Sequence, residues 1–345
     1  MPTLWFCLVA VMLAGYVILD GFDIGAGILH LFVARSNAER RAVLASIGPV
    51  WDGNEVWLLA AGGTLYFAFP GLYASSFSGF YLALMIVLWL LILRGIAIEF
   101  RSHVVHDMWH SFWDVVFAGA SLLLAIFYGT ALGNVVRGVP LDPDGTFFVA
   151  LWTNLQPGAD PGIIDWYTVL IGLAALVTLT VHGALWVALK TTGDLQVRCQ
   201  AAALRLSYVL VPLVALISLV SFDIQPILLE SFAARPWGIL FPILSTAGLA
   251  GIFVFSKSRR DPAAFVSSCV FILGLLCSAA FGLYPTLLPS TGDASRSLTV
   301  SNVSAAPYGL RIGLYWFLPA FALALAYSAF VYRRFRGKVG SESGH

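Results

Sequence analysis

The sequence predicts an all-α integral membrane protein that crosses the membrane nine times, with its N-terminus outside and its C-terminus inside. Of its 345 residues, 59% are hydrophobic and only 11% are charged, whereas about a quarter of the residues in soluble domains are charged. Several apolar runs are long enough to cross the hydrocarbon core of a bilayer. Basic residues gather in alternate loops, as expected if those loops face the cytoplasm.

The apolar runs place the expected spans along the chain. Eight of them lie at residues 4–32, 76–98, 112–133, 163–189, 203–221, 238–256, 263–286 and 308–332. A ninth run, near 52–70, is weaker because it opens with Asp52, Asn54 and Glu55. The first run is too long for a signal peptide and no basic stretch precedes it, so we expect it to be retained as a span.

The loop charges indicate that the weak run also crosses. Segment 33–51 holds three arginines, and segment 99–111 holds Arg101 with Arg94 just before it. Both segments therefore belong on the cytoplasmic side, which requires an even number of crossings between them. Runs 52–70 and 76–98 together supply those two crossings.

The later loops alternate in the same way. Basic residues gather at 190–205, at 257–260 and in the C-terminal tail, which are all placed inside. The three remaining loops carry one basic residue each and are placed outside: 134–162, 222–237 and 287–307. No linker separates soluble domains, so we expect residues 1–345 to form one polytopic membrane domain.

Composition also excludes several classes of function. The 19 basic and 18 acidic residues give a net charge of +1, which does not indicate a nucleic-acid partner. The four cysteines include no CxxC pair and therefore predict neither a metal site nor a disulfide. No nucleotide-binding loop, zinc motif or Ser/His/Asp arrangement is recognisable.

The first span contains two acidic residues. Asp20 and Asp23 are three positions apart and so share a helical face, while Gly21 and Gly25 form a GxxxG step that allows close helix packing. Asp20 lies about 24 Å along the helix from residue 4, which places both acids in the inner half of the membrane. A buried acid that gains and loses a proton suits a proton relay. Alternatively, both acids only bind a neighbouring helix or an arginine.

A second polar cluster, WDGNEVW at residues 51–57, opens the second span at its cytoplasmic end. Asp and Asn are favoured at helix N-termini, so capping by Asp52 or Asn54 is one interpretation. Three polar side chains and two tryptophans are more than a cap requires. A carboxylate at the water boundary is also where a proton path would begin.

A third cluster lies at the inner end of the third span. Arg94 follows an unbroken apolar run and should either extend to water or pair with a carboxylate. Glu99 and Arg101 follow it. Asp114 opens the fourth span, either as an acid at the helix N-terminus or as a partner for Arg94, and the sequence does not choose between them.

The histidines are candidate haem ligands, because a haem iron needs axial ligands. His103, His106 and His110 would fit one helix face but are expected to form a solvated surface patch. His30 lies near the inner end of the first span, and His182 is expected to be a core histidine with satisfied hydrogen bonds. The spacing shows no pair of histidines placed for a haem within one helix.

Two of these motifs closely resemble those of a known family. The segments LDGFDIG at 19–25 and WDGNEVW at 51–57 are similar to motifs of subunit II of cytochrome bd-type quinol oxidases. Shorter matches follow at residues 77–81, Arg94 with 100–101, 113–114, 190–195 and 284–285. The likeness runs from about residue 10 to the end of the chain.

This resemblance implies a two-subunit respiratory oxidase of the bacterial inner membrane that oxidises quinol, reduces O2 to water and separates charge. It places two haems b, one haem d and the quinol-oxidising loop in a partner, subunit I, so that this chain alone binds no cofactor. It also implies two four-helix bundles, here 1–133 and 163–286, with a ninth, peripheral helix at 308–334. The N-terminus would then be periplasmic and the C-terminus cytoplasmic.

The resemblance also implies roles for single residues. Asp52 matches an acid assigned to proton entry from the cytoplasm, and Asp20 and Asp23 match acids of that route or of the subunit interface. Relatives can carry Gln at the position of Glu55, so we do not expect Glu55 to carry protons.

The remaining motif residues are assigned to structure, haem assembly or the subunit interface: Trp51, Asn54, Trp57, Arg94, Arg101 and Asp114. The three histidines at 103–110 have no family motif behind them, and their role stays open.

Two other functions remain open from the sequence. The chain could be a scaffold for subunit I, in which the acids merely cap and pair, or a proton-coupled secondary transporter. The polar residues are confined to the first four expected helices, which argues against the two matching halves of a transporter. The sequence does not show which quinone is used, whether the partner holds haem d, whether a structural quinone binds this chain, or whether small single-span subunits attach.

Overall fold

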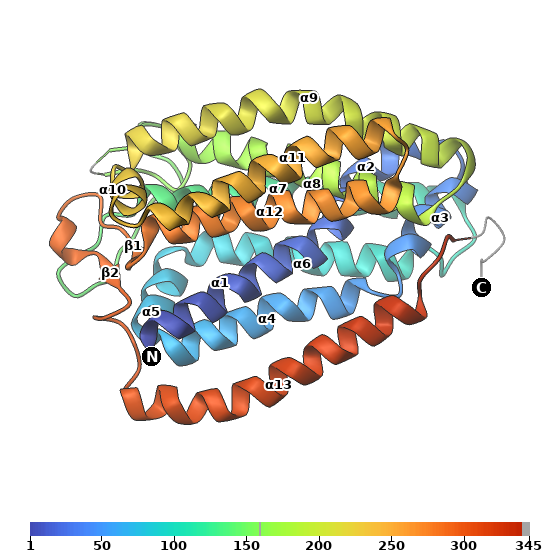
Figure 1. Cartoon of the computed structure of the whole chain (residues 1–345). Coiled ribbons are helices and arrows are strands. Elements are labelled where there is room, and N and C mark those ends of the chain that lie inside the picture. The colour runs from blue at the N-terminus through green and yellow to red at the C-terminus, as the bar shows by residue number, and fades with distance from the viewer. Residues whose placement is uncertain (159, 340–345) are drawn as a thin grey trace.

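The computed structural model describes residues 1–158 and 160–339, and in this part of the chain nearly all regular structure is helical. The long helices lie side by side along one common direction (Figure 1). The N-terminus and α5 (Pro70–Gly79) lie at one end, and α3 (Asn37–Ile47) and the end of the described chain lie at the other.

The described chain contains eight helical segments that are long and apolar enough to span a membrane. The first consists of α1 (Pro2–Leu19) and α2 (Gly21–Val33) together. The others contain the following helices: α6 (Tyr81–Phe100), α7 (Asp107–Arg137), α8 (Trp166–Lys190), α9 (Gly193–Ile224), α11 (Leu240–Lys257), α12 (Asp261–Leu283) and α13 (Pro307–Arg334).

The weak run near 52–70 forms α4 (Trp51–Ala68), a helix of 18 residues that packs along α1 and α5. It does not reach the apolarity of the eight segments. Nine crossings, the placement of the ends on either side of the membrane and the division at 1–133, 163–286 and 308–334 therefore stay predictions.

The first span departs from the single helix that was expected. It is interrupted at Asp20, between α1 and α2. Side chains of other helices use backbone carbonyls at this break, because Asn54 Nδ2 lies 3.0 Å from the Leu19 oxygen and His182 Nε2 lies 2.9 Å from the Ile18 oxygen. The break is therefore tied to both α4 and α8.

Small residues bring the helices into close contact, as the GxxxG step predicts. A Cβ atom added to Gly25 would lie 1.9 Å from the Leu179 oxygen and 2.8 Å from the Cα of Gly183, so α2 and α8 touch backbone to backbone. Beside this contact, Phe22 stacks on Trp186 at a ring distance of 4.0 Å. In a membrane the hydrophobic effect does not drive helices together, because lipid tails are as apolar as the side chains. Close backbone contact of this kind contributes van der Waals packing energy instead.

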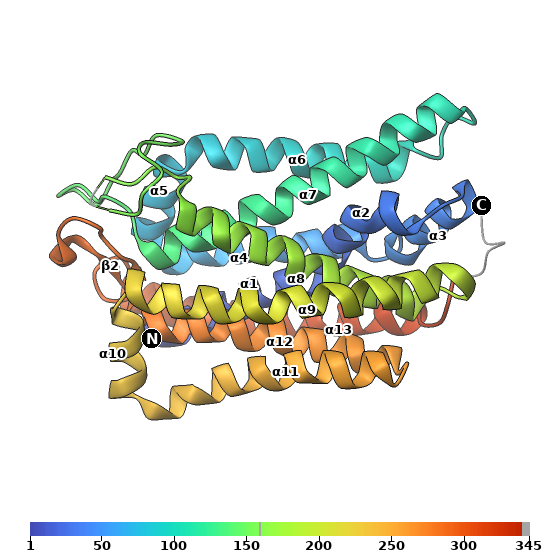
Figure 2. The same cartoon turned by 90° about the horizontal axis from the view of Figure 1, so that it is seen from above.

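The end that holds the N-terminus carries the ordered loops. They contain α10 (Ile227–Ala234), the short 3-10 helices η1 (Pro236–Ile239) and η2 (Ala294–Arg296), and an antiparallel pair of β1 (Thr286–Leu288) with β2 (Leu298–Thr299). In Figure 2, α10 joins α9 to η1 and α11 at this end. In the described chain these segments connect one long helix to the next.

Candidate functional site

A buried ion network lies where α1, α4 and α6 meet. Arg94 Nη2 donates to Asp20 Oδ1 at 2.7 Å and to Glu55 Oε1 at 2.6 Å. The Arg94 and Asp20 side chains are fully buried, whereas a quarter of the Glu55 side chain is exposed. Arg94 therefore pairs with carboxylates, which confirms one of the two alternatives derived from its apolar surroundings.

Two tyrosines extend this network away from Arg94. The Tyr16 hydroxyl lies 2.8 Å from Asp20 Oδ2 and 2.8 Å from the Tyr128 hydroxyl of α7. Tyr16 lies one helical turn before Asp20, so both side chains project to the same side of α1. Each hydroxyl can both donate and accept a hydrogen bond, and the row Asp20, Tyr16, Tyr128 is continuous.

Asp23 has different partners from Asp20. Asn54 Nδ2 donates to Asp23 Oδ2 at 2.7 Å, and the Tyr332 hydroxyl of α13 donates to Asn54 Oδ1 at 2.8 Å. Asp23 is fully buried, and its Oδ1 has no hydrogen-bond partner among the described residues. Asn54 thus links α1, α2, α4 and α13, and it does not cap α4, whose N-cap position is Val50 without a side-chain cap.

The charges of this network do not balance if every acid is ionised. Three carboxyl groups, those of Asp20, Asp23 and Glu55, surround the single guanidinium of Arg94, which contacts Asp20 and Glu55 directly. A buried carboxylate without a cation is strongly disfavoured, and its neutral, protonated form is favoured instead. The arrangement therefore has the capacity to hold at least one exchangeable proton.

Asp114 lies at the centre of a second buried cluster. Its Oδ1 lies 2.5 Å from His30 Nε2 and accepts from Arg101 Nε, and its Oδ2 accepts from Arg40 at 2.9 Å. Arg101 also donates to Asn37 at 2.8 Å. Asp114 lies inside α7, which begins at Asp107, and it does not contact Arg94. Both sequence-based interpretations of Asp114, as an N-terminal acid and as the partner of Arg94, are therefore wrong.

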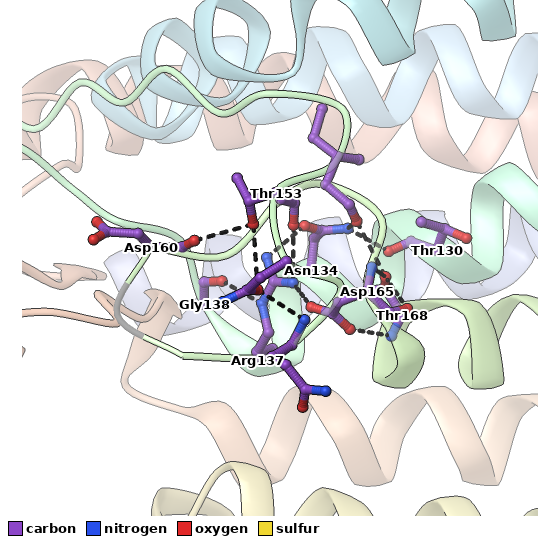
Figure 3. A network of polar contacts seen from close by, with 12 residues as sticks. Thr130, Asn134, Arg137, Gly138, Thr153, Asp160, Asp165 and Thr168 are labelled. Carbon is purple, nitrogen blue, oxygen red and sulfur yellow. Dashed lines mark hydrogen bonds and ion pairs between the residues drawn. The ribbon is translucent and has the colours of Figure 1, made fainter.

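A third buried cluster lies at the end that carries the ordered loops (Figure 3). Arg137, the last residue of α7, forms an ion pair with Asp165, which caps α8 through Thr168 at 2.9 Å. Arg137 also donates to Asn134 Oδ1 at 2.7 Å and to the Gly162 oxygen at 3.1 Å. The sequence indicated only that Arg137 stands alone in an outer loop.

The residues of the 51–57 motif separate into different environments. Asp52 lies in the first turn of α4 and is exposed. Trp51 packs against Gly95 of α6, and Trp57 packs on Gly15 of α1 and on Phe321 of α13. The structure thus places Asp52 at the surface, at the end of α4 nearest to the buried acids.

Comparison with known proteins decides the family. The model of the family described as "Cytochrome bd terminal oxidase subunit II" matches residues 1–335. The chain belongs to this family. It is 32% identical to the cytochrome bd ubiquinol oxidase subunit 2 of Bacillus subtilis, over 90% of this chain and 88% of that protein.

Other relatives of the bd oxidase subunit II family cover nearly the whole chain. The cytochrome bd-I ubiquinol oxidase subunit 2 of Escherichia coli K12 is 29% identical over 98% of this chain and 95% of that protein. A probable cytochrome oxidase subunit 2 of Haemophilus influenzae is also 29% identical, over 97% and 94%. A chain of the bd oxidase from Geobacillus thermodenitrificans has the same fold, with a TM-score of 0.74 and 14% identity over 97% of this chain and 98% of that one.

The histidines that the structure describes in this bd oxidase subunit contact other residues of the chain or lie at its surface. His182 Nδ1 contacts Ser268 at 2.7 Å, and its other ring nitrogen contacts the Ile18 oxygen, which confirms a satisfied core histidine. His30 contacts Asp114, and the side chains at 103–110 lie at or near the surface. No group of three or more metal-ligating side chains occurs in the described part of the chain.

Sequence reasoning missed several members of the network. Tyr16, Tyr128 and Tyr332 were not singled out, and Glu55 was set aside as tolerant of substitution. The signal for Tyr16 was its position one turn before Asp20. Tyr128 and Tyr332 come from distant helices, and only the fold shows that they reach these acids.

Proposed function

We propose that this chain is subunit II of a quinol-oxidising bd-type terminal oxidase in a bacterial cytoplasmic membrane. It forms a heterodimer with a haem-bearing subunit I and supplies part of the proton path from the cytoplasm to the site of O2 reduction. Family membership and the names of the ubiquinol oxidase relatives support the assignment to the oxidase. The same membership favours this role over the transporter alternative.

The observation that carries the proton path is the excess of buried acid around Arg94. Asp20 and Asp23 are both without exposed surface, and a single guanidinium serves Asp20 and Glu55. From Asp20, hydrogen bonds continue through Tyr16 to Tyr128. From Asp23, they continue through Asn54 to Tyr332. Buried acids are expensive in a membrane and by default indicate a functional site.

Each acid has a distinct task in this proposal. The haems of subunit I supply the electron transfer and O2 chemistry, and the reduction of O2 to water consumes protons. The exposed carboxylate of Asp52 collects protons at the membrane surface. Asp20 pairs with Arg94 and passes the proton on. Asp23 holds a proton, because no cation contacts it among the residues that the structure describes. Glu55 serves as an acceptor for Arg94.

The test compares acid-to-amide variants in the purified oxidase complex. We expect Asp52→Asn and Asp23→Asn to lower quinol oxidase turnover about tenfold or more, as the loss of a positioned proton carrier does, with the haem spectrum unchanged. Glu55→Gln keeps an oxygen acceptor for Arg94 and is expected to retain activity. Asp107→Asn is a matched control, since Asp107 is an exposed acid in the first turn of α7.

A scaffold role for the same acids is the second candidate, favoured by the direct pairing of Asp20 with Arg94 across two helices. Proton uptake during turnover separates the two functions. If Asp52→Asn and Asp23→Asn leave uptake and turnover unchanged while the haems remain bound, the proton path is excluded and the scaffold role stands.

A further inference from the structure

A cavity of about 580 Å3 lies between α2, α8 and α9, and none of its lining residues belongs to the buried ion network around Arg94. Its walls are largely apolar and include Ile28, Leu29 and Phe32. The cavity opens to the surface, since 74% of the Phe32 side chain is exposed. Helix α9 lies at the opposite edge of the molecule from α13 (Figure 1). The volume lies within the range of ordinary ligand sites.

Three arginines line this apolar cavity. Arg35 follows the end of α2, and Arg198 and Arg205 lie on α9. The cavity-lining positions of α9 are 198, 201, 202, 205 and 206, which is the spacing of one helix face. The charged groups and the apolar surface therefore belong to one continuous wall.

The positive charge of this wall is only partly neutralised. Glu39 of α3 forms an ion pair with Arg198 and accepts from the Arg35 backbone N–H at 2.6 Å. Burial acts to raise the pKa of Glu39, but the hydrogen bonds from Arg35 and Arg198 outweigh it and lower the pKa, so Glu39 is ionised at neutral pH. Among the described residues, one carboxylate faces three guanidinium groups, which leaves two positive charges for a ligand.

The arginines lie at the depth of lipid headgroups. From Arg205 to the end of α9 at Ile224 the helix runs for about 29 Å at 1.5 Å per residue, which matches a hydrocarbon core of about 30 Å. Arg205 therefore lies at the boundary between the core and the headgroups, and Arg35 and Arg198 lie beyond the apolar parts of their helices. This is the end of the bundle that the loop charges assign to the cytoplasm.

We propose that this cavity binds one anionic phospholipid, with its phosphate at Arg35 and Arg205 and an acyl chain along Ile28, Phe32 and Leu206. Basic pockets between membrane helices bind anionic headgroups in this way. A quinone would fill the apolar part of the cavity, but its neutral head would leave two arginines without a counter-charge. The lipid also covers the exposed ring of Phe32.

The test is lipid retention by the purified oxidase complex. Native mass spectrometry of the wild type in mild detergent is expected to show one tightly held phosphatidylglycerol or cardiolipin. The double variant Arg35→Gln, Arg205→Gln is expected to bind it about 30-fold more weakly, because each arginine near an anionic surface contributes a factor of about five. Arg41→Gln with Arg260→Gln removes two exposed arginines outside the cavity and is expected to retain the lipid.

A second variant tests the apolar part without changing the charge. Ala202→Trp fills the cavity from α9 and is expected to expel the lipid while all three arginines remain. After delipidation, vesicles of phosphatidylglycerol are expected to raise the Tm of the wild type, whereas phosphatidylcholine vesicles and inorganic phosphate leave it unchanged. Equal retention of lipid in wild type, the Arg35/Arg205 variant and Ala202→Trp overturns the proposal, and so does extraction of a quinone in place of the phospholipid.

Discussion

Two parts of this molecule hold their helices together by opposite means. Around α1, α4 and α6, buried ion pairs connect neighbouring helices. Arg94 of α6 pairs with both Asp20 and Glu55. Between α11 and α12 the apolar helix interiors carry no charged residue, and backbones touch at glycines instead. A Cβ atom at Gly248 would lie 2.4 Å from the Phe271 nitrogen, and one at Gly274 would lie 2.4 Å from the Ser245 nitrogen.

The difference shows what each kind of contact provides. Small residues let helices approach and gain van der Waals energy without committing any group to a charge state. Buried ions are weak evidence for added stability, because desolvation offsets much of their attraction, but breaking one partner is costly. The α1–α4–α6 region therefore bears a desolvation cost for its buried charges, and the α11–α12 pair does not. Such a cost is consistent with a functional role for the acids.

The largest expected effect comes from breaking the ion network. Arg94→Gln leaves Asp20 buried without a cation and is expected to destabilise the chain by about 3–5 kcal/mol. Thermal unfolding of the purified complex and its haem content measure this loss. The double variant Asp20→Asn, Arg94→Gln removes both charges and is expected to recover much of the stability. If Arg94→Gln alone unfolds like the wild type, the network does not hold these helices together.

A smaller effect is expected from the glycine contact. Gly248→Ala inserts a methyl group against the backbone of α12 and is expected to cost about 1–3 kcal/mol through overpacking, with turnover per folded complex unchanged. Gly119→Ala is the matched control, because no other part of the described chain lies within 4 Å of a Cβ at Gly119, apart from its own helix backbone and chain neighbours. Equal unfolding temperatures for the two alanine variants would contradict a packing role for Gly248.

The smallest effect is expected from the partly exposed ion pair of Glu39 with Arg198. Glu39 and Arg198 keep 24% and 20% of their side chains exposed, in contrast to the fully buried Asp20 and Arg94. Glu39→Gln is therefore expected to cost no more than about 1 kcal/mol, and less at high salt. Glu99→Gln serves as the control, because Glu99 is exposed and its side chain forms no ion pair with the residues that the structure describes.

The pH dependence of this pair sharpens the comparison. Burial acts to raise the pKa of Glu39, and hydrogen bonds from Arg35 and Arg198 outweigh it, so its folded-state pKa lies below the ordinary glutamate value. Its stabilisation is present above that ordinary value and is lost as the pH falls through the lowered pKa. Unfolding curves of wild type and Glu39→Gln are thus expected to converge in acid. If the two proteins still differ in stability at acid pH, the contribution of Glu39 does not come from its ion pair with Arg198.

The sequence predicted those features that depend on one segment. Asp20 and Asp23 could be placed inside the bundle because the apolar residues around them leave no other position, and Gly25 could be assigned to close packing from the GxxxG spacing alone. Both depend on the hydrophobic period and on residue size. Neither the hydrophobic period nor the GxxxG spacing shows which other helix packs against these residues.

Partners from distant segments could not be predicted. The contacts of Asp114 come from His30, Arg40 and Arg101, which precede it by 84, 74 and 13 residues. Arg94 was equally compatible with several acids until the fold selected Asp20 and Glu55. Each helix forms its backbone hydrogen bonds internally, so the choice of neighbouring helix depends on how the helices pack. The pattern of charges along one sequence does not show that choice.

The interruption at Asp20 has a consequence for how the chain is made. The Ile18 carbonyl beside the break is bound by His182, which the ribosome adds long after the first span has entered the bilayer. The Leu19 carbonyl finds Asn54 much earlier. The first span can thus dock onto α4 early in synthesis, but the contacts at its interruption are completed only when the fifth apolar run arrives. Truncation before residue 182 would therefore leave the Ile18 carbonyl without its His182 partner.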